Sequence, residues 1–473
     1  MTRHQQRRTS RQKHPKNNQT AGRLPRNAAP IEVEILHIGG RGDGIAKARY
    51  THHHQEDDYD VFVPASLPGE QLVVQPTHLT RQGIKARIIE LKKPSHERQA
   101  PRCDVFPACG GCNFQHWNDA SVSQWKTNLV MHFLARASVS PDSIRAPHTS
   151  PPKSRRRASF HLKCLADGAV MGFSERMSTH IVRPANCDIL HPKLMQLCQS
   201  LEFFASTHLA TGFTADIHVN LLGDSPEPTL CVYVASASKS GIFPSNHMPV
   251  ITNWAASEKL GRLTVDDAGG PVTLYAPEMP YTTFGDIAVS PPAGAFLQAT
   301  LDGETALQSA VRDSLGGARR VADLFAGCGT LSLPLLPNLS DLLAVEADRP
   351  ALHALKAGAD MAGYGGRVTT LGRNLFEAPM LAKDLAGCEA VILDPPRSGA
   401  LNQCLALGES EVGKIAMVSC NPASFSRDAA ILTKAGFRLS WLQMIDQFSF
   451  SNHLELVGSF TRPAKRDATV RPR

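Results

Sequence analysis

Apolar residues in the C-terminal third of the chain form short runs separated by amphipathic stretches. Four of these runs have the length and composition of buried parallel strands: RRVADLF, DLLAVE, EAVILD and KIAMVSC. Helical stretches such as RPALHALKAGADMAG, residues 349–363, separate them. This alternation predicts an α/β fold with an open, doubly wound, Rossmann-like sheet over residues 301–462.

The N-terminal part has the pattern of an all-β domain. From Ile31, apolar and polar residues alternate in IEVEILHIGGRGDGIAKA up to a glycine-rich turn, and again in VFVPASLPGEQLVVQP. Short strands punctuated by glycine and proline predict a small β-barrel over residues 31–97. Such barrels can bind single-stranded nucleic acid, although a purely structural barrel fits equally well. Residues 98–300 mix helix, strand and proline-rich pieces and indicate an α+β domain.

Composition places the chain among multidomain globular proteins, because 473 residues can form two or three separate cores. No run of about 18 uninterrupted apolar residues is present, which argues against a membrane span or a membrane partner. The N-terminus lacks the apolar core of a signal peptide. We therefore expect a cytoplasmic protein with reduced thiols. Its oligomeric state is open, and a monomer is plausible.

Positive charge is concentrated at the N-terminus. The net charge is +7, and residues 1–30 contain eight Lys and Arg residues but no Asp or Glu. Such a tail suggests a polyanionic partner, and a disordered solubilising tail is an equally good interpretation. A second, shorter basic tail is expected at residues 463–473.

Ligands of open α/β sheets bind beyond the carboxyl ends of the strands, so the residues that follow each run are site candidates. After the first run, Gly327 and Gly329 allow a tight turn close to a ligand, but a dinucleotide fingerprint would need a third glycine near Ser332. The second run ends at Glu346, whose carboxylate can accept both hydroxyls of an adenosine ribose. Together these features fit S-adenosylmethionine. Taken singly, each also fits a structural turn or a surface Glu.

The third and fourth runs end in candidates for catalysis. The third leads into Asp394, which two prolines hold at the rim of the cleft; enzymes methylating amino nitrogens tend to place an aromatic residue where Arg397 follows. The fourth ends at Cys420, just before a predicted helix. Helix-terminal amides can lower the pKa of such a thiol and favour a thiolate nucleophile. A buried structural Cys is the alternative.

These motifs resemble those of the RNA uracil-C5 methyltransferase family. The family's DPPR and SCNP are intact, its FxQxN reads FLQAT at residues 296–300, and its DxFPxTxHxE reads DQFSFSNHLE at residues 446–455. The chain departs from the family motifs at three positions. Thr300 replaces the family's Asn, Ser449 replaces its Pro, and Ser451 replaces its Thr. The resemblance implies a class I methyltransferase domain, a TRAM or OB-like barrel before it, and S-adenosylmethionine as cofactor.

Three cysteines lie close together in PRCDVFPACGGCNFQHW, residues 101–117. In a reducing compartment, clustered thiols more often mark metal binding or catalysis than disulfides. Iron–sulfur members of the family carry this CxxxxxCGGC pattern and a fourth Cys, which NCDILHP reproduces here. The resemblance implies a [4Fe–4S] cluster in the central domain with these ligands: Cys103, Cys109, Cys112 and Cys187. Tetrahedral zinc is the rival, because four cysteines suit it equally well.

Uracil C5 can attack a methyl sulfonium only after its ring has been made electron-rich. The resemblance assigns the addition to C6 to Cys420 and the later removal of the C5 proton to Glu455, whose pKa burial would raise. A surface Glu is the plainer interpretation of Glu455. Asp394 would hold the uracil edge. The resemblance also implies these cofactor-binding residues: Gln298, Phe325, Thr330, Glu346 and Asp394.

The expected product is 5-methyluridine in RNA. The iron–sulfur ligands favour 23S ribosomal RNA over transfer RNA by analogy, and the target base would be flipped out of folded RNA. Arg155, Arg156 and Arg157 could hold phosphates or form a solvated strand edge. Methylation of another base stays open, although RNA cytosine-C5 enzymes place a Cys near the position of Asp394. A non-catalytic RNA-binding scaffold with a structural metal also stays open.

Overall fold

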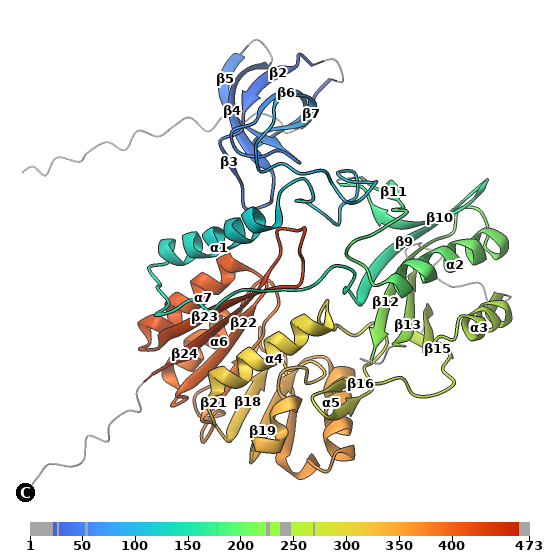
Figure 1. Cartoon of the computed structure of the whole chain (residues 1–473). Helices are drawn as coiled ribbons and strands as arrows, with labels where there is room; N and C mark the ends of the chain where they lie inside the picture. Colours follow the sequence, from blue (N-terminus) through green and yellow to red (C-terminus); the bar gives the residue numbers. More distant parts are fainter. Residues whose placement is uncertain are drawn as a thin grey trace, which may run out of the picture. The chain divides into compact units, whose positions relative to one another are not determined.

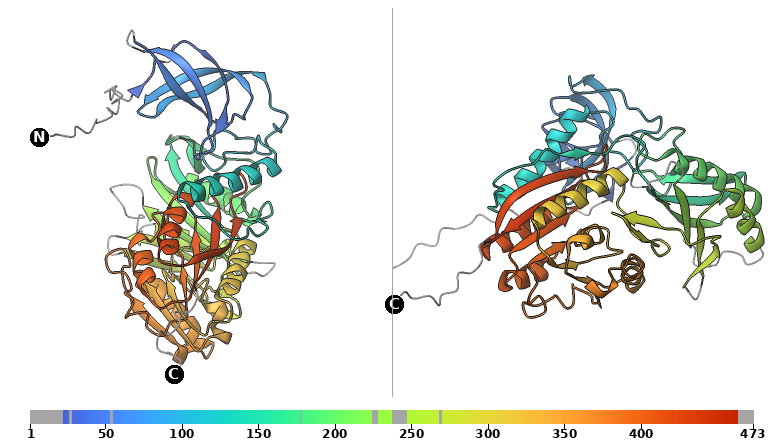
Figure 2. Two further views of the ribbon diagram at one scale, coloured as in Figure 1. Left: turned by 90° about the vertical axis from the view of Figure 1, so that its left-hand side faces the viewer. Right: turned by 60° about the horizontal axis from the view of Figure 1, so that its bottom comes forward.

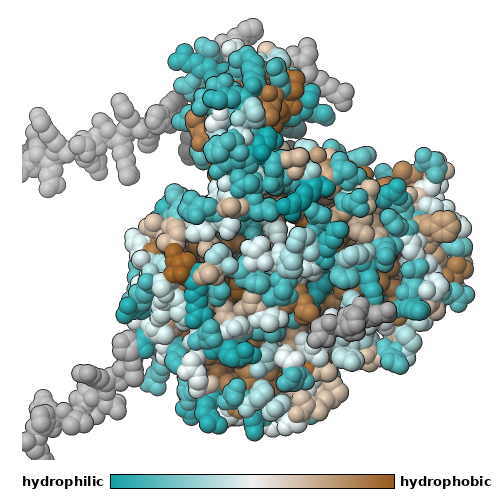
Figure 3. Space-filling view, viewed as in Figure 1, coloured by the Kyte–Doolittle hydropathy of each residue, from teal (hydrophilic) through white to brown (hydrophobic). Residues whose placement is uncertain are grey.

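The computed structural model describes residues 22–25, 28–52, 55–176, 178–223, 228–236, 247–267 and 270–462. Chain contacts divide it into an N-terminal unit, Met1–Arg98, and a C-terminal unit, Gln99–Arg473. Most of the basic tail expected at residues 1–30, and all of the tail expected at 463–473, lies outside the described residues. Within the described residues, no helix has the length and apolar character needed to cross a membrane. The face seen in Figure 3 is mainly hydrophilic, with small scattered hydrophobic patches.

The N-terminal unit is built from strands, as the alternating pattern predicted (Figure 1). Seven strands form one sheet in the order β1-β6-β7-β5-β4-β3, with β2 paired to β6. Their bounds are β1 Gly22–Arg23, β2 Ile31–Glu34, β3 His37–Ile38, β4 Gly44–His52, β5 Gln55–Val63, β6 Gln71–Thr80 and β7 Gly83–Lys93. Alternate residues such as Val61, Val63 and Val74 turn inward and form the core.

The central part of the C-terminal unit contains a second sheet, in the order β11-β10-β9-β12-β13-β14-β15. The strands are β9 Arg157–Leu165, β10 Gly168–Ser174, β11 Ile181–Val182, β12 Thr214–Leu222, β13 Thr229–Ser236, β14 Arg262–Asp267 and β15 Gly270–Tyr275. Helices α2 (Pro192–His208) and α3 (Met248–Ser257) share its core, which contains Phe160 and Leu201. A short hairpin follows, made by β16 (Thr282–Phe284) and β17 (Ile287–Val289).

The doubly wound sheet predicted for the C-terminal part is confirmed. Its order is β20-β19-β18-β21-β22-β24-β23-β8, and the first five strands are parallel. The bounds are β8 His148–Thr149, β18 Arg320–Leu324, β19 Asp341–Glu346, β20 Val368–Gly372, β21 Ala390–Leu393, β22 Lys414–Ser419, β23 Arg438–Asp446 and β24 Glu455–Thr461. The helices and 3-10 turns are α4 Leu301–Leu315, η2 Leu333–Asn338, α5 Arg349–Met361, η3 Gly365–Arg367, α6 Leu401–Glu409 and α7 Pro422–Lys434. Helices lie on both faces of this sheet (Figure 2).

One part of the expected central domain belongs to the C-terminal sheet instead. Helix α1 (Asp119–Arg136) packs beside α7 (Figure 1). Strand β8 extends the sheet by pairing with β23. The buried residues of α1 recur every four positions and form one stripe: Val122, Lys126, Val130 and Leu134. Such a stripe predicts a packed helix but not its partner, so the sequence did not indicate that α1 packs against the C-terminal sheet.

Candidate active site

The three predicted catalytic residues lie at the ends of three adjacent strands. Asp394 follows β21, Cys420 follows β22, and Glu455 begins β24. Strands β22 and β24 are antiparallel, and the pair in register just before Cys420 is Ser419 with Leu456. Cys420 and Glu455 are therefore brought opposite one another, and both interact electrostatically with Asp394.

Burial dominates the behaviour of the two carboxyl groups. It raises the pKa of Glu455 to about 8, helped by the nearby Asp394 carboxyl and opposed by Arg397 and Arg157. The expectation that burial raises the pKa of Glu455 is thus confirmed. Burial also raises the pKa of Asp394 to about 7. Near neutral pH, both groups can exist in either protonation state and therefore accept or donate a proton.

The expected lowering of the Cys420 pKa is wrong in direction. Burial and the neighbouring Glu455 carboxylate raise the pKa of this thiol, and Arg397 opposes them. Two backbone N–H groups beside the thiol donate to other acceptors, Asn421 N to Ser419 Oγ and Ala423 N to Asn421 Oδ1. The raised pKa favours the neutral thiol form of Cys420 at rest.

Two further polar residues reach the same site. Arg397 interacts with the Cys420 thiol, and its Nη2 lies 3.1 Å from His453 Nδ1. Burial, followed by the charge of Arg397, lowers the pKa of His453 to about 4, so this imidazole is neutral near pH 7. Both stand inside motifs quoted above, DPPR and DQFSFSNHLE, but the sequence assigned them no role.

The turn after β18 contains the residues that the sequence predicts for cofactor binding. Phe325 has φ = 67°, a conformation rare for a bulky residue and often found at functional sites, and Gly327 and Gly329 also have positive φ. Gly327 N donates to Glu346 Oε2 at 3.0 Å. A Cβ added at Gly327 would meet no atom within 4 Å, so the backbone is open on that side. Phe325 and Glu346 therefore lie at adjacent strand ends, as predicted.

Two other predicted cofactor residues are held by neighbours within the protein. Gln298 is buried, and its Oε1 accepts from Gln447 Nε2 at 2.9 Å. The carbonyl of Thr330 accepts from Gln308 at 3.0 Å. Gln298 is thereby linked to the segment that leads to Glu455, an arrangement that the FLQAT motif alone did not indicate.

The three departures from the family motifs all form polar contacts. Thr300 caps α4 and its hydroxyl lies 2.7 Å from Ser150 Oγ. Ser449 donates to the carbonyl of the same Ser150 at 3.4 Å. Ser451 Oγ accepts from the backbone N–H of His453 at 3.2 Å. These substitutions therefore keep the segment before Glu455 bonded to its surroundings.

Comparisons with known proteins agree with this geometry. A family model described as tRNA (uracil-5-)-methyltransferase matches residues 380–462, which contain Asp394, Cys420 and Glu455. An uncharacterized RNA methyltransferase of Mesorhizobium japonicum is 34% identical over 434 residues, and the match covers 91% of this chain and 98% of that protein. The chain belongs to the RNA uracil-C5 methyltransferase family.

Two other similarities add detail. The 23S rRNA (uracil(1939)-C(5))-methyltransferase of Alteromonas naphthalenivorans is 27% identical, over 92% of this chain and 90% of that protein. The crystal structure of Pyrococcus abyssi tRNA (uracil-54, C5)-methyltransferase with S-adenosyl-L-homocysteine has a TM-score of 0.68 at 18% identity, covering 91% of this chain and 99% of that chain. This last likeness shows the fold. As a family member the protein is an RNA methyltransferase, which sets aside the non-catalytic scaffold.

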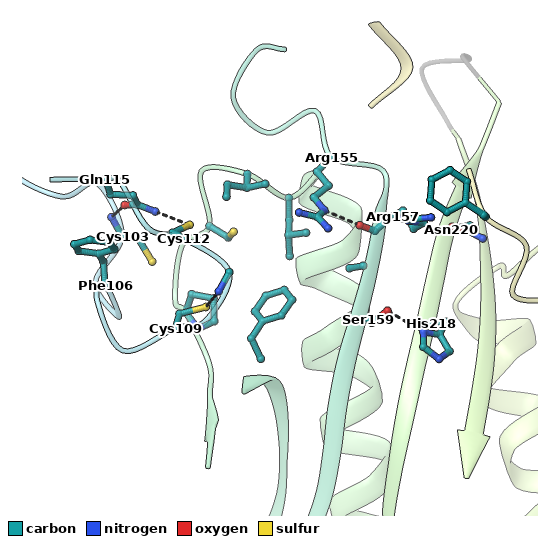
Figure 4. Close-up of a pocket in the computed structure, with 18 of the residues that line it drawn as sticks. Cys103, Phe106, Cys109, Cys112, Gln115, Arg155, Arg157, Ser159, His218 and Asn220 are labelled. Carbon is teal, nitrogen blue, oxygen red and sulfur yellow. Dashed lines mark hydrogen bonds between the residues drawn. The ribbon is translucent and has the colours of Figure 1, made fainter. Parts of the chain in front are cut away.

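The four cysteines singled out in this methyltransferase line one cavity of about 460 Å³, here called the cysteine cavity (Figure 4). Its cysteine lining consists of Cys103, Cys109, Cys112 and Cys187. Gln115 Nε2 donates to the sulfur of Cys112 at 3.2 Å, and Gly111 N lies 3.5 Å from the sulfur of Cys109. Burial raises the pKa of Cys112 to about 12, so this thiol ionises only with the help of a positive charge.

Protein contacts already join the two segments that contribute these cysteines. Cys109 forms an isolated bridge with Glu175, just beyond β10. Ala185 N donates to Asp104 Oδ2 at 3.3 Å, near Cys187. Among the residues that the structure describes, no group of three or more His, Cys, Asp or Glu side chains is arranged to hold a metal ion. The cysteines therefore share a cavity, and their binding of a cluster stays a prediction.

The three consecutive arginines have different environments, because alternate residues at the start of β9 face opposite sides. Arg156 forms a buried ion pair with Glu304 at 2.5 Å, with side chains 4% and 1% exposed. It is neither a phosphate ligand nor part of a solvated edge, so that expectation was wrong for Arg156. Arg155 and Arg157 line the cysteine cavity, and the Arg157 guanidinium lies 4.1 Å from the Phe296 ring centroid.

Replacing Arg156 by Met is expected to destabilise the C-terminal unit by about 3–5 kcal/mol, because Glu304 would be left buried without its partner. All four tryptophans lie in this unit, so their fluorescence during urea unfolding measures the effect. The control is Arg438→Met, which removes an exposed guanidinium paired with Asp142 and should leave the unfolding midpoint close to that of wild type. Equal effects of both variants would contradict the prediction.

Proposed function

We propose that this enzyme methylates C5 of uracil in RNA, with S-adenosylmethionine as methyl donor and 23S ribosomal RNA as substrate, in the cytoplasm. The observation that carries the proposal is the meeting of Cys420, Asp394 and Glu455 at the ends of adjacent strands. A thiol beside two carboxyl groups of raised pKa supplies both a nucleophile and a base. The full-length similarity to a 23S rRNA enzyme supports the choice of RNA.

The cofactor would bind at the turn after β18. Gly327 leaves backbone exposed there, Phe325 offers an aromatic ring, and the Glu346 carboxylate, held by Gly327 N, would accept hydrogen bonds from the ribose hydroxyls. Gln298 and Thr330 would complete the site. When bound, S-adenosylmethionine supplies an electrophilic methyl group.

The chemistry begins with the Cys420 thiol. Because burial keeps it neutral at rest, the guanidinium of Arg397 would stabilise the thiolate as its proton passes to solvent water. The sulfur then adds to C6 of uracil, and the electron pair of the C5–C6 bond moves toward C5 and O4. Carbon C5 thereby becomes nucleophilic enough to attack the methyl group, and the C5–methyl bond would form as the methyl–sulfonium bond breaks and leaves S-adenosylhomocysteine.

Glu455 completes the reaction. Methylated C5 still carries its hydrogen, and the ionised Glu455 carboxylate would accept that proton. The electron pair left on C5 re-forms the C5–C6 double bond and expels the sulfur of Cys420. Asp394, with a pKa of about 7, can donate to O4 or accept from N3–H of the ring, which would select uracil and stabilise the enolate.

Turnover is expected to rise with pH through the pKa of Glu455. A carboxyl group with a raised pKa is protonated below that value, so the base form is scarce in acid and abundant above about pH 8. Between about pH 6 and pH 7 the rate of product release from a preformed adduct should increase about tenfold. Rapid-quench measurements over this range test it, and a flat profile would assign the proton transfer to another group.

We further propose that the cysteine cavity holds a [4Fe–4S] cluster. Four thiols line it, N–H groups point at two of the sulfurs, and the Arg155 charge interacts with Cys112 and Cys187. A zinc ion would need its sulfurs within about 2.3 Å of one point, whereas a cluster fills the space between thiolates that each bind a separate iron. When bound, the cluster would fasten the two cysteine segments together.

Anaerobically purified protein is therefore expected to contain about four iron and four sulfide per chain. Cys109→Ala should lose most of both, while Cys388→Ala, a half-buried cysteine outside the cavity, should keep them. Metal analysis and visible absorbance measure this. Finding one zinc per chain and no sulfide would contradict the cluster and show that the cavity binds zinc instead.

The proposed function is tested by nucleoside mass spectrometry on separated 23S ribosomal RNA and transfer RNA from strains with and without the gene. Loss of 5-methyluridine from the ribosomal fraction alone supports reaction and substrate together. Loss from transfer RNA keeps the reaction and overturns the substrate. No loss from either fraction overturns both.

A further inference from the structure

The segment that leads to Glu455 is held by a lysine from a distant helix. Residues 446–455, here called the catalytic loop, join β23 to β24. Lys126 of α1 donates from Nζ to Asp446 Oδ2 at 2.5 Å and to the carbonyl of Phe448 at 3.1 Å. Its side chain is 4% exposed and that of Asp446 is 11% exposed. The loop is thus tied at its first residue to a helix 320 positions earlier in the chain.

The residues next to the cysteine cavity hold the same loop. The backbone N–H groups of Asn113 and Phe114 both donate to the carbonyl of Phe450, at 2.6 and 3.0 Å. Asn113 directly follows Cys112 in the sequence. Phe114 is buried, and its ring packs edge-on against that of Trp125, with the ring centroids 4.9 Å apart. Trp125 directly precedes Lys126 in the sequence. Residues 113–126 therefore contact the catalytic loop at two places. Lys126 binds its start, and the amides of Asn113 and Phe114 bind its middle.

Hydrogen bonds inside the loop connect these points toward Glu455. Asp446 Oδ1 accepts from Phe448 N at 2.9 Å, and Phe448 in turn accepts from Ser451 N at 2.8 Å. Ser451 Oγ accepts from His453 N at 3.2 Å, two residues before Glu455. A displacement at Lys126 would therefore reach the catalytic carboxyl through a continuous set of bonds.

A purely structural role explains this lysine poorly. Lys126 lies in the buried stripe of α1, whose other members Val122, Val130 and Leu134 are apolar. Burying an ammonium group is costly, and a well-packed apolar residue would often stabilise such a helix as much or more. A buried ion pair does, however, specify one geometry, because both partners must meet at a fixed distance.

We propose that Lys126, together with the Asn113 and Phe114 amides, forms a clamp that fixes the catalytic loop so that Glu455 meets the C5 proton. Lys126 is a positioning residue in this clamp. The inference rests on the proposed function for the identity of the step. It predicts that loss of the clamp slows proton removal, the last chemical step, and leaves the earlier addition of Cys420 and cofactor binding unchanged.

Lys126→Met is expected to slow release of methylated RNA about 100-fold, because small misplacements of a catalytic group have effects of this size. The covalent enzyme–RNA adduct should accumulate on denaturing gels, while its rate of formation and the affinity for S-adenosylmethionine stay within about threefold of wild type. Lys126→Arg should restore release by keeping the cation. Gln124→Met, on the exposed face of the same helix, is the matched control and should behave as wild type.

Hydrogen exchange of the full-length variants supplies a readout that needs no activity. Lys126→Met should lose protection in residues 446–455 and keep it in α1 and β22. If Lys126→Met keeps the protection of residues 446–455 and releases methylated RNA at the normal rate, the proposal is overturned. Equal loss of adduct formation, cofactor binding and α1 protection, without rescue by Arg, also overturns it, since the lysine would then only stabilise the fold. If wild type forms no 5-methyluridine, the proposed function fails and the exchange pattern alone decides whether the clamp exists.

Discussion

Replacement of Cys420 by Ala is expected to lower the rate of 5-methyluridine formation by at least about 10⁴-fold, because the covalent route to a nucleophilic C5 is removed. No other group named at these strand ends offers a sulfur to C6. RNA containing 5-fluorouridine should trap wild type as a covalent complex, since fluorine at C5 cannot leave as a proton. The Cys420→Ala variant should form no such complex on a denaturing gel.

Cys388→Ala is the matched control for this experiment. That cysteine lies just before β21 and outside the site, so its variant should form the covalent complex at the wild-type rate. A complex that persists in Cys420→Ala would show that a different residue adds to C6. Loss of the complex in both variants would indicate unfolding, which the tryptophan fluorescence described above detects separately.

Replacement of Glu455 by Gln is expected to slow product release by about 10²–10⁴-fold, which is the usual size of a general-base effect. Glutamine has nearly the same shape but cannot accept the C5 proton, so methylated RNA should stay bonded to Cys420. The variant should therefore transfer close to one methyl group per enzyme and then stop. Quantifying methyl transfer and covalent complex in the same reaction separates this defect from a loss of binding.

Glu411→Gln, an exposed carboxyl on the loop before β22, is the control and should turn over normally. Normal release by Glu455→Gln would assign the base to Asp394, the other carboxyl of raised pKa in the site. The Cys420 and Glu455 variants are thus expected to block different steps of the reaction. Cys420→Ala prevents the adduct, and Glu455→Gln preserves it.

Much of the C-terminal sheet could be predicted from the sequence. Parallel strands buried on both faces require continuous apolar runs, and such runs lie within β18, β19, β21 and β22. Alternation predicted the strands of the N-terminal unit, because one face of each strand is buried. The residues after the runs predicted the site, since parallel strands bring their carboxyl ends to one edge.

Environment-dependent properties could not be predicted in this way. The pKa of Cys420 depends on Glu455 and Arg397, which come from other strands and a separate loop. The basic triplet looked uniform, yet its middle member, Arg156, pairs with Glu304 inside the protein. Local sequence states which groups are present, while burial and neighbouring charges decide their protonation and partners.

The sequence by itself therefore determined the class of fold, the strand ends proposed to form the site and the cluster of Cys103, Cys109 and Cys112, because these depend on periodicity and spacing along the chain; Cys187 was added only by the family resemblance. Only the tertiary structure decided that α1 packs beside α7, that Lys126 reaches Asp446, and that the segment after Cys112 contacts the catalytic loop. Those contacts join residues hundreds of positions apart. Local patterns cannot specify them, because a buried stripe requires a packing partner without indicating which one it is.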